Sequence, residues 1–182
     1  SAAVLTDDRL TLGIGTSPWP VDYEVCDVPF EGRGKRADES IAVMRGLLTG
    51  DWFEFHGDIY DVPKIKQCPA PARPIPIIVG GDTRAAARRA GRLGDGYFPA
   101  RGASPELLDE MRRAAGEAGR NPDDIEITVS APTEPHEIEA LARRGVRRVA
   151  VPVSGAAGLP AQVRTPDDVL RYGKTMIDRF HD

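Results

Sequence analysis

The chain has 182 residues, of which 41% are hydrophobic and 29% are charged, and its formal net charge is -4. These values are typical of a globular domain with one buried core, and the lack of a basic excess argues against a nucleic-acid-binding protein. No stretch approaches the roughly 18 consecutive apolar residues of a membrane-spanning helix, and no signal peptide is recognisable, so we expect a cytoplasmic protein that contacts no membrane.

The first predicted strand covers residues 9–14, which are rich in strand-forming residues and lead into a glycine-bearing turn at residues 13–17. A helix is predicted over residues 35–49, because apolar residues recur there at three- and four-residue spacing and Gly50 follows in the position of a helix stop.

Two irregular segments follow this helix. Residues 52–62 alternate apolar with polar side chains and predict a small hairpin, while residues 67–76 hold four prolines and predict an extended connector. Residues 16–74 would thus form an excursion at the rim, between the first and second strands of the sheet.

From residue 75 onward, strands and helices alternate. Residues 75–79 are continuously apolar, the pattern of a parallel strand that is covered on both faces. The elements predicted after it are a helix over 84–93, a strand over 96–98, a helix from Ser104 to about Gly119, a strand over 125–129, a helix over 135–144 and a strand over 149–153. Thr165 caps the last predicted helix, whose apolar stripe consists of Val169, Leu170, Met176, Ile177 and Phe180.

This alternation of five strands with helices predicts an α/β fold with a parallel sheet. A closed (β/α)8 barrel takes about 250 residues, so residues 1–182 would form a single domain that is too short for a complete barrel; the family resemblance described below implies a partial barrel. A doubly wound nucleotide-binding domain is the alternative, but no Gly-x-Gly-x-x-Gly motif with a downstream acidic residue is present. Because the chain begins with Ser1 and soon reaches a strand, we expect that upstream residues have been removed.

The cysteines and histidines form no recognisable site. Cys26 and Cys68 are far apart and belong to no Cys-x-x-Cys motif, so neither a zinc site nor a disulfide framework is expected. His56, His136 and His181 have no partner at ligand spacing, and we therefore expect no metal. No Ser-His-Asp or Cys-His arrangement can be argued either, so the catalytic residues are not assigned.

Several motifs resemble, in their order and spacing, the luciferase-like monooxygenase family, which includes deazaflavin-dependent enzymes of actinobacteria. The resemblance rests on residues 9–15 followed by Trp19, on residues 74–81, on the Gly-Asp-Gly-aromatic pattern that ends at Tyr97, and on residues 119–122. It implies a TIM barrel of which strands four to eight are present and strands one to three are absent. It also implies FMN or coenzyme F420, a deazaflavin, as the cofactor, and a small organic molecule as the substrate.

The glycine pattern and the resemblance together identify a candidate phosphate site at Gly80, Gly81, Asp82 and Thr83, where a strand ends and a helix begins. Glycines let an anion approach main-chain N–H groups, and the Thr83 hydroxyl can donate a further hydrogen bond. Arg84, in the first turn of the helix, would oppose the helix dipole unless an anion is bound. Alternatively, the glycines only form a tight turn and Asp82 is a structural N-cap, whose carboxylate would compete with phosphate for the same donors.

The turn after the first strand is a second candidate wall of this site, because members of the family contribute backbone donors from it. Its candidate cofactor-binding residues are Gly13, Gly15, Thr16 and Ser17. Pro18 interrupts the family's glycine-then-tryptophan pattern, and Trp19 either contacts the cofactor or packs under the loop. Arg33, Arg36 and Glu39 could orient the cofactor's tail, although charges on an amphipathic helix more often form a solvated face.

We expect an oxidoreductase whose redox chemistry belongs to its cofactor. The alternative is a truncated, catalytically inactive barrel fragment that acts only through assembly with another chain. Five parallel strands without their companions leave two unpaired edges, so we expect a homo-oligomer or association with the absent N-terminal segment.

Overall fold

The computed structural model describes residues 2–132, 134–151 and 163–174. Its centre is a five-stranded sheet in which every neighbouring pair of strands is parallel. The strand order is β1 (Leu12–Ile14), β4 (Ile77–Gly80), β5 (Gly96–Phe98), β6 (Glu126–Ser130) and β7 (Val146–Ala150). The predicted α/β class and parallel sheet are confirmed.

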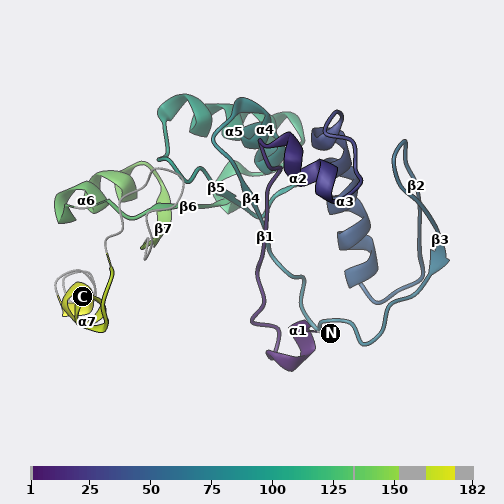
Figure 1. The fold of residues 1–182 in the computed structure, drawn as a ribbon, viewed down its shortest axis with the longest axis horizontal. Coiled ribbons are helices and arrows are strands. Elements are labelled where there is room, and N and C mark those ends of the chain that lie inside the picture. The colour runs from purple at the N-terminus through teal and green to yellow at the C-terminus, as the bar shows by residue number, and fades with distance from the viewer. Residues whose placement is uncertain (1, 133, 152–162, 175–182) are drawn as a thin grey trace.

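Helices separate the later strands, as the sequence predicts. They are α4 (Arg84–Leu93), α5 (Pro105–Glu117) with the short 3-10 helix η1 (Pro122–Asp124), and α6 (Pro135–Arg143); α7 (Pro166–Tyr172) follows the last strand. Figure 1 shows α4 and α5 lying together on one side of the strands. No helix among the described residues is long and apolar enough to cross a membrane.

The segment between β1 and β4 holds more structure than predicted. It contains α2 (Pro20–Val25), α3 (Arg33–Leu48) and an antiparallel hairpin of β2 (Phe53–His56) and β3 (Asp61–Ile65), which lies beyond α3 at one end of the molecule (Figure 1). Helix α3 and the hairpin confirm the helix predicted over residues 35–49 and the hairpin predicted over residues 52–62. Helix α2 was missed, as was α1 (Ala2–Leu5), because both are too short to show a periodic pattern.

Two predictions near the C-terminus need correction. The strand expected at residues 149–153 exists as β7, but it begins three residues earlier, directly after Gly145 ends the preceding helix with a φ of 88°. Residues 152 and 153 lie outside the described residues. The start of β7 does not form an apolar run, because Arg147 and Arg148 are charged and exposed. Val169 and Leu170, expected in an apolar stripe, are 57% and 66% exposed. The other stripe residues, Met176, Ile177 and Phe180, lie outside the described residues.

The hydrophobic core lies between the sheet and helices α4 and α5. Strand residues that point toward these helices are at most 4% exposed; they are Ile77, Val79, Tyr97, Ile127 and Val129. Ile78 and Phe98, on the other face, are only half-buried. The prediction that both faces of the strand at 75–79 are covered is therefore wrong for the described residues, because α4 and α5 lie on one face alone.

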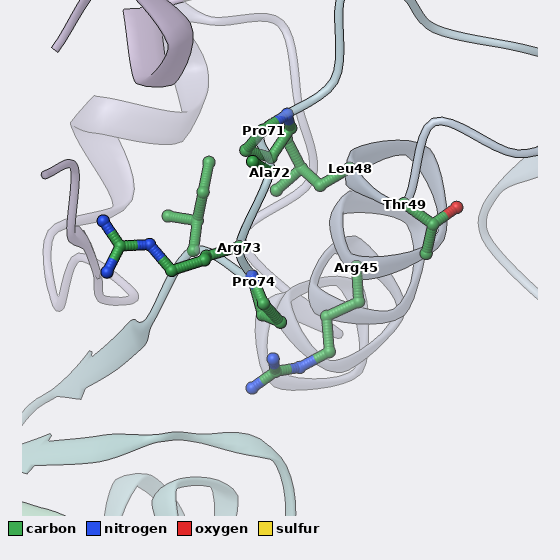
Figure 2. Close-up of a pocket in the computed structure, with 8 residues that line it drawn as sticks. Arg45, Leu48, Thr49, Pro71, Ala72, Arg73 and Pro74 are labelled. Carbon is green, nitrogen blue, oxygen red and sulfur yellow. The ribbon is translucent and has the colours of Figure 1, made fainter. Parts of the chain in front are cut away.

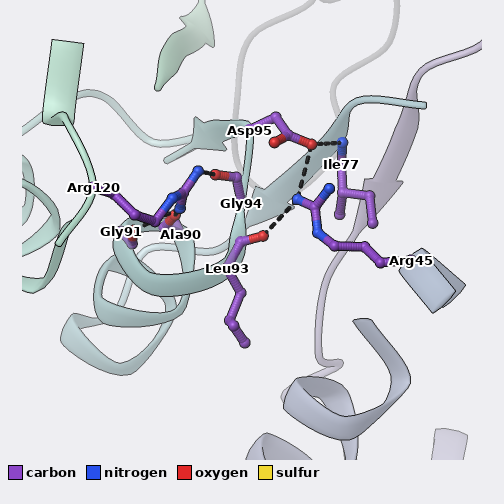
Figure 3. Close-up of polar contacts among 8 residues, drawn as sticks. All are labelled: Arg45, Ile77, Ala90, Gly91, Leu93, Gly94, Asp95 and Arg120. Atoms are coloured by element: carbon purple, nitrogen blue, oxygen red, sulfur yellow. Dashed lines mark hydrogen bonds and ion pairs between the residues drawn. The ribbon is translucent and has the colours of Figure 1, made fainter. Parts of the chain in front are cut away.

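The Gly-Asp-Gly pattern at residues 94–96 ties α3, α4 and β4 together (Figure 3). The Asp95 carboxylate accepts hydrogen bonds from the Ile77 N–H group at 2.8 Å and from Arg45 at 2.9 Å. Arg120 donates to the carbonyl groups of Gly91 at 2.7 Å and Gly94 at 2.6 Å, and so caps the end of α4. These motif residues therefore have structural roles at the end of the sheet where the strands begin.

Glu39 fixes the hairpin to α3. Its carboxylate accepts hydrogen bonds from the N–H groups of Tyr60, Ile59 and Asp58 at 2.9 to 3.1 Å. These donors, Tyr60 first, lower the pKa of the Glu39 carboxyl below its ordinary value. The expectation that Glu39 orients a cofactor tail is replaced by this structural role.

The depressed pKa of Glu39 predicts acid-dependent opening of the hairpin. A carboxylate whose pKa is lower in the folded state stabilises the fold above its unfolded pKa, and this contribution is lost as the pH falls through the folded pKa. We expect the protection of the amides of residues 58–60 against hydrogen exchange, relative to an unstructured peptide at the same pH, to fall below about pH 4, near the ordinary pKa of glutamate. In Glu39→Gln the side chain does not titrate and accepts through one oxygen only, so protection of these amides should be lower and show no step in that range; an unchanged step would contradict the assignment.

Candidate functional site

Among the described residues, two of the cavities lie at opposite ends of the sheet. The one at the start of β4 measures about 320 Å³ and lies between the C-terminal part of α3 and residues 71–75 (Figure 2). Arg45 extends into this region from α3, but its guanidinium already donates to the Leu93 carbonyl at 2.7 Å and to Asp95. The larger cavity, about 560 Å³, opens where β1 and β4 end. Active sites of parallel α/β barrels lie at the carboxyl ends of the strands, so the larger cavity is the candidate site.

The larger cavity joins the two glycine turns that the sequence singled out. Its lining includes Thr16 and Ser17 from the turn after β1, and Gly80 to Thr83 from the turn after β4. An ideal Cβ atom at Gly15 would lie 3.8 Å from the Gly80 carbonyl oxygen, so the two turns approach closely. Gly13 is different, because it lies inside β1 opposite Ile78 rather than in the turn.

The turn after β4 presents main-chain donors to the cavity. The Gly81 N–H group donates to the Phe98 carbonyl at 3.1 Å and is therefore not available to a ligand. In the part of the chain that the structure describes, the N–H groups of residues 82–85 have no protein acceptor. These four groups lie in the last two residues before α4 and in its first two residues, where the helix dipole favours an anion.

Asp82 is not the N-cap of α4. That position belongs to Thr83, whose hydroxyl accepts a hydrogen bond from Ala86 N–H at 3.2 Å and keeps its own proton free to donate. The Asp82 carboxylate instead accepts the Arg101 N–H group at 2.9 Å. The competition between Asp82 and an anion for the helix donors is thereby removed. Arg84, in the first turn, is exposed.

Tyr97 holds the glycine turn in place, a role the sequence did not reveal. The residue is 0% exposed, and its hydroxyl donates to the Gly81 carbonyl at 3.0 Å. Burial, with a smaller contribution from the Asp82 charge, raises the pKa of Tyr97 far above its ordinary value, so it remains a neutral donor. The aromatic position of the Gly-Asp-Gly-aromatic pattern was the available signal, because a buried tyrosine hydroxyl needs a partner.

Removing this hydroxyl should loosen the turn. In Tyr97→Phe the Gly81 carbonyl loses its donor, which we expect to cost about 1–3 kcal/mol of unfolding free energy and to weaken cofactor binding several-fold. Tyr60→Phe is the matched control, because the Tyr60 hydroxyl also makes one side-chain hydrogen bond, to Ser40 at 3.2 Å, but lies in the hairpin. Chemical denaturation and cofactor titration of both variants check this; equal cofactor affinities would contradict it.

The turn after β1 is organised by Ser17. Its hydroxyl donates to Asp22 at 2.5 Å and accepts the Trp19 N–H group at 3.1 Å, while its carbonyl accepts the Tyr23 hydroxyl at 3.3 Å. These contacts hold α2 beside the cavity. Trp19 itself is 62% exposed, so the expectation that it packs under the loop is wrong.

The charged residues of α3 contribute unequally to the cavity. Arg33 lines it, whereas Arg36 donates to the Pro29 carbonyl at 2.9 Å. Arg89 and Arg101, which the sequence did not single out, also line it. Sequence periodicity could not find them, because α4 and the loop after β5 are brought to the cavity only by strand pairing.

No histidine belongs to the cavity lining. His56 lies in β2 and pairs with Asp61 at 2.5 Å, His136 is an exposed residue of α6, and His181 lies outside the described residues. Within residues 2–132, 134–151 and 163–174, no group of three or more His, Cys, Asp or Glu side chains could hold a metal ion. The site can therefore bind and orient an anionic ligand through main-chain donors and arginines.

The comparisons with known proteins point to one family. Residues 1–174 match the model of a family described as luciferase-like monooxygenase. An uncharacterized protein of Mycobacterium tuberculosis is 48% identical over 149 residues, which cover 80% of this chain and 47% of that protein. The F420-dependent glucose-6-phosphate dehydrogenase of Mycolicibacterium gilvum is 36% identical over 144 residues, which cover 72% of this chain and 43% of that enzyme. The chain thus spans about half the length of the curated relatives it matches.

Solved structures share the fold. The coenzyme F420 dependent tetrahydromethanopterin reductase from Methanopyrus kandleri superposes with a TM-score of 0.60 at 18% identity, covering 70% of this chain and 42% of that chain. The EDTA monooxygenase from Chelativorans gives a TM-score of 0.59 at 18% identity, covering 97% and 52%. At these identities the likeness shows the fold alone.

Proposed function

Because the chain belongs to the luciferase-like monooxygenase family, we propose that it is the part of a flavin- or deazaflavin-dependent oxidoreductase that grips the cofactor's phosphate and borders its substrate. The observation that carries this proposal is the row of N–H groups at residues 82–85 that have no acceptor among the described residues, next to a cavity that both glycine turns line. The substrate would be a small organic molecule.

The shape of the turn fits a phosphate-bearing cofactor. Gly81 has a φ of 131°, a backbone conformation that side chains disfavour, and an ideal Cβ atom there would lie only 2.9 Å from the Ala86 Cβ atom. A side chain would disturb the turn and the start of α4, where the donors lie. The glycine thus keeps open the approach of an anion to the helix.

Each part of the cavity has a defined task in this proposal. The N–H groups of residues 82–85 and the Thr83 hydroxyl bind the phosphate, and the turn of Thr16 and Ser17 forms the opposite wall. Tyr97 fixes the position of the donors by its hydrogen bond to Gly81. The cofactor, when bound, supplies the electron-transfer chemistry, and the protein supplies position and an environment that excludes water.

A binding titration tests the proposal directly. FMN and coenzyme F420 are added to the chain alone, and to the chain mixed with the N-terminal half of the 48% identical M. tuberculosis relative, while cofactor fluorescence is followed. We expect saturable binding of at least one cofactor. Absence of saturable binding of both cofactors in both mixtures would refute the proposal.

We further propose that the chain works in association with another barrel segment or a second copy of itself. Within the described residues β1 pairs only with β4 and β7 only with β6, so each end of the sheet has an unpaired edge. Such edges, together with the half-buried Ile78 face, favour association. Light scattering of the isolated chain should show oligomers; a stable monomer would contradict this proposal.

A further inference from the structure

Arginines outnumber carboxylates in the lining of the larger cavity. Four ionisable side chains line it, and Arg89 is neutralised by an ion pair with Asp38. Asp82 is the one carboxylate among the four, and it accepts the main-chain N–H group of Arg101 rather than its guanidinium. Arg33, the fourth, forms no ion pair in the part of the chain that the structure describes. With Arg89 paired, Arg33 and Arg101 face a single lining carboxylate, so the cavity has an excess positive charge to which Arg33 contributes.

Arg33 is held in position by aromatic contacts. Its guanidinium lies 3.8 Å from the centre of the Phe30 ring, and Phe30 meets the edge of Tyr23 at 5.3 Å between ring centres. Tyr23 in turn donates to the Ser17 carbonyl, so this stack is anchored to the turn after β1. A guanidinium that stacks on a ring keeps its N–H edge available for a bidentate contact with a carboxylate or phosphate.

The phosphate donors and Arg33 come from different elements. The donors begin α4, after β4, whereas Arg33 begins α3, in the excursion that follows β1. The cavity thus continues from the phosphate turn toward a second anion-binding group. A phosphomonoester is the end of its molecule, so nothing extends beyond the phosphate-binding turn. A phosphodiester has a further substituent, which can reach such a group.

The fixed charge of Asp82 also favours a diester. Asp82 lines the same cavity, and like charges repel in proportion to their product. A phosphomonoester has close to two negative charges at neutral pH, whereas a diester has one. Repulsion from Asp82 is therefore weaker for a diester.

We infer that Arg33 selects a cofactor with negative charge beyond its phosphate, namely a phosphodiester with a carboxylate-bearing tail as in coenzyme F420, over the terminal phosphate of FMN. This inference rests on the proposed phosphate site at residues 82–85. It makes Arg33 a specificity-determining residue and assigns the tail to the segment between Ser17 and Arg33.

Dissociation constants of three probes test the selection: coenzyme F420, coenzyme F420 whose glutamate tail has been removed, and FMN. They are measured by fluorescence on the chain in the state, alone or assembled, that binds cofactor. We expect the wild type to prefer intact coenzyme F420 over FMN by about tenfold or more, the effect of one charge-assisted contact. Arg33→Gln should abolish most of this preference, while leaving FMN and the tail-less probe within about threefold of their wild-type affinities.

Arg73→Gln is the matched control. Arg73 is an exposed arginine at the opposite end of the sheet and makes no ion pair among the described residues, so its replacement removes the same charge without touching the site (Figure 2). Its three dissociation constants should equal those of the wild type. Equal wild-type affinity for FMN and coenzyme F420, or an equal loss for all probes in Arg33→Gln, overturns the selection while the phosphate site stands. Binding of no probe overturns both.

Discussion

Gly91→Ala is expected to destabilise the fold by about 2 kcal/mol, although the same change in an exposed helix stabilises it by about 1 kcal/mol. An ideal Cβ atom at Gly91 would lie 2.3 Å from the Met111 carbonyl oxygen and 2.9 Å from the Ala115 nitrogen. Both atoms belong to the backbone of α5, so no change of rotamer can relieve the overlap. Overpacking costs about 1–3 kcal/mol, and a backbone clash belongs at the upper end of that range. The gain of about 1 kcal/mol in helix propensity offsets part of this cost.

Gly116→Ala is the control for this prediction. Gly116 lies in α5, and an ideal Cβ atom there meets nothing within 4 Å. Helix propensity alone then acts, and the variant should be more stable by up to about 1 kcal/mol. Chemical denaturation measures both changes. A stabilised Gly91→Ala variant would show that α4 and α5 are not packed as closely as the structure has them.

Gly81→Ala is expected to lower cofactor affinity by about 100-fold, which corresponds to about 2.7 kcal/mol of binding free energy. A residue with a side chain pays about 1–3 kcal/mol of strain at such a φ, and its Cβ atom would press on Ala86 in the first turn of α4. If the turn relaxes, the N–H groups of residues 82–85 change direction and the phosphate loses its donors. If the turn resists, the same strain lowers the stability of the fold.

Measuring stability and affinity together separates these outcomes. Gly119→Ala is the control, because Gly119 also has a positive φ, of 71°, but lies at the other end of the sheet, with nothing within 4 Å of its ideal Cβ atom. Gly119→Ala should lose stability without losing cofactor affinity. An affinity in Gly81→Ala within threefold of the wild type would remove this turn from the binding site.

The candidate site combines fixed main-chain donors with an adjustable side chain. The donors at residues 82–85 are properties of the backbone, and their direction depends on Gly81 and on the Tyr97 hydroxyl beneath it. Preorganised main-chain donors need no reorientation when an anion arrives. Arg33 and the stack of Phe30 on Tyr23 provide the adjustable, side-chain part of the same site.

Local signals in the sequence determined the later elements well. Helix α4 has the predicted bounds of residues 84–93, and α5 begins with Ser104 as the N-cap and Pro105 in the first turn, as predicted. Caps and stops act over three or four residues, so they can be recognised without knowledge of the fold. The alternation of strands and helices then predicted the parallel sheet.

Tertiary structure alone decided the details of the candidate site. Periodicity cannot show that β1 pairs with β4 across the intervening α2, α3 and hairpin, and this pairing is what brings the two glycine turns to one cavity. It also cannot show that Asp82 turns toward Arg101, or that the Gly81 N–H group is used by Phe98. These contacts join residues distant in sequence, and their partners are fixed by the packing of strands and helices. The sequence thus determined which segments are strands, helices and turns, while the direction of each donor and the free charge of Arg33 followed only from how those segments pack.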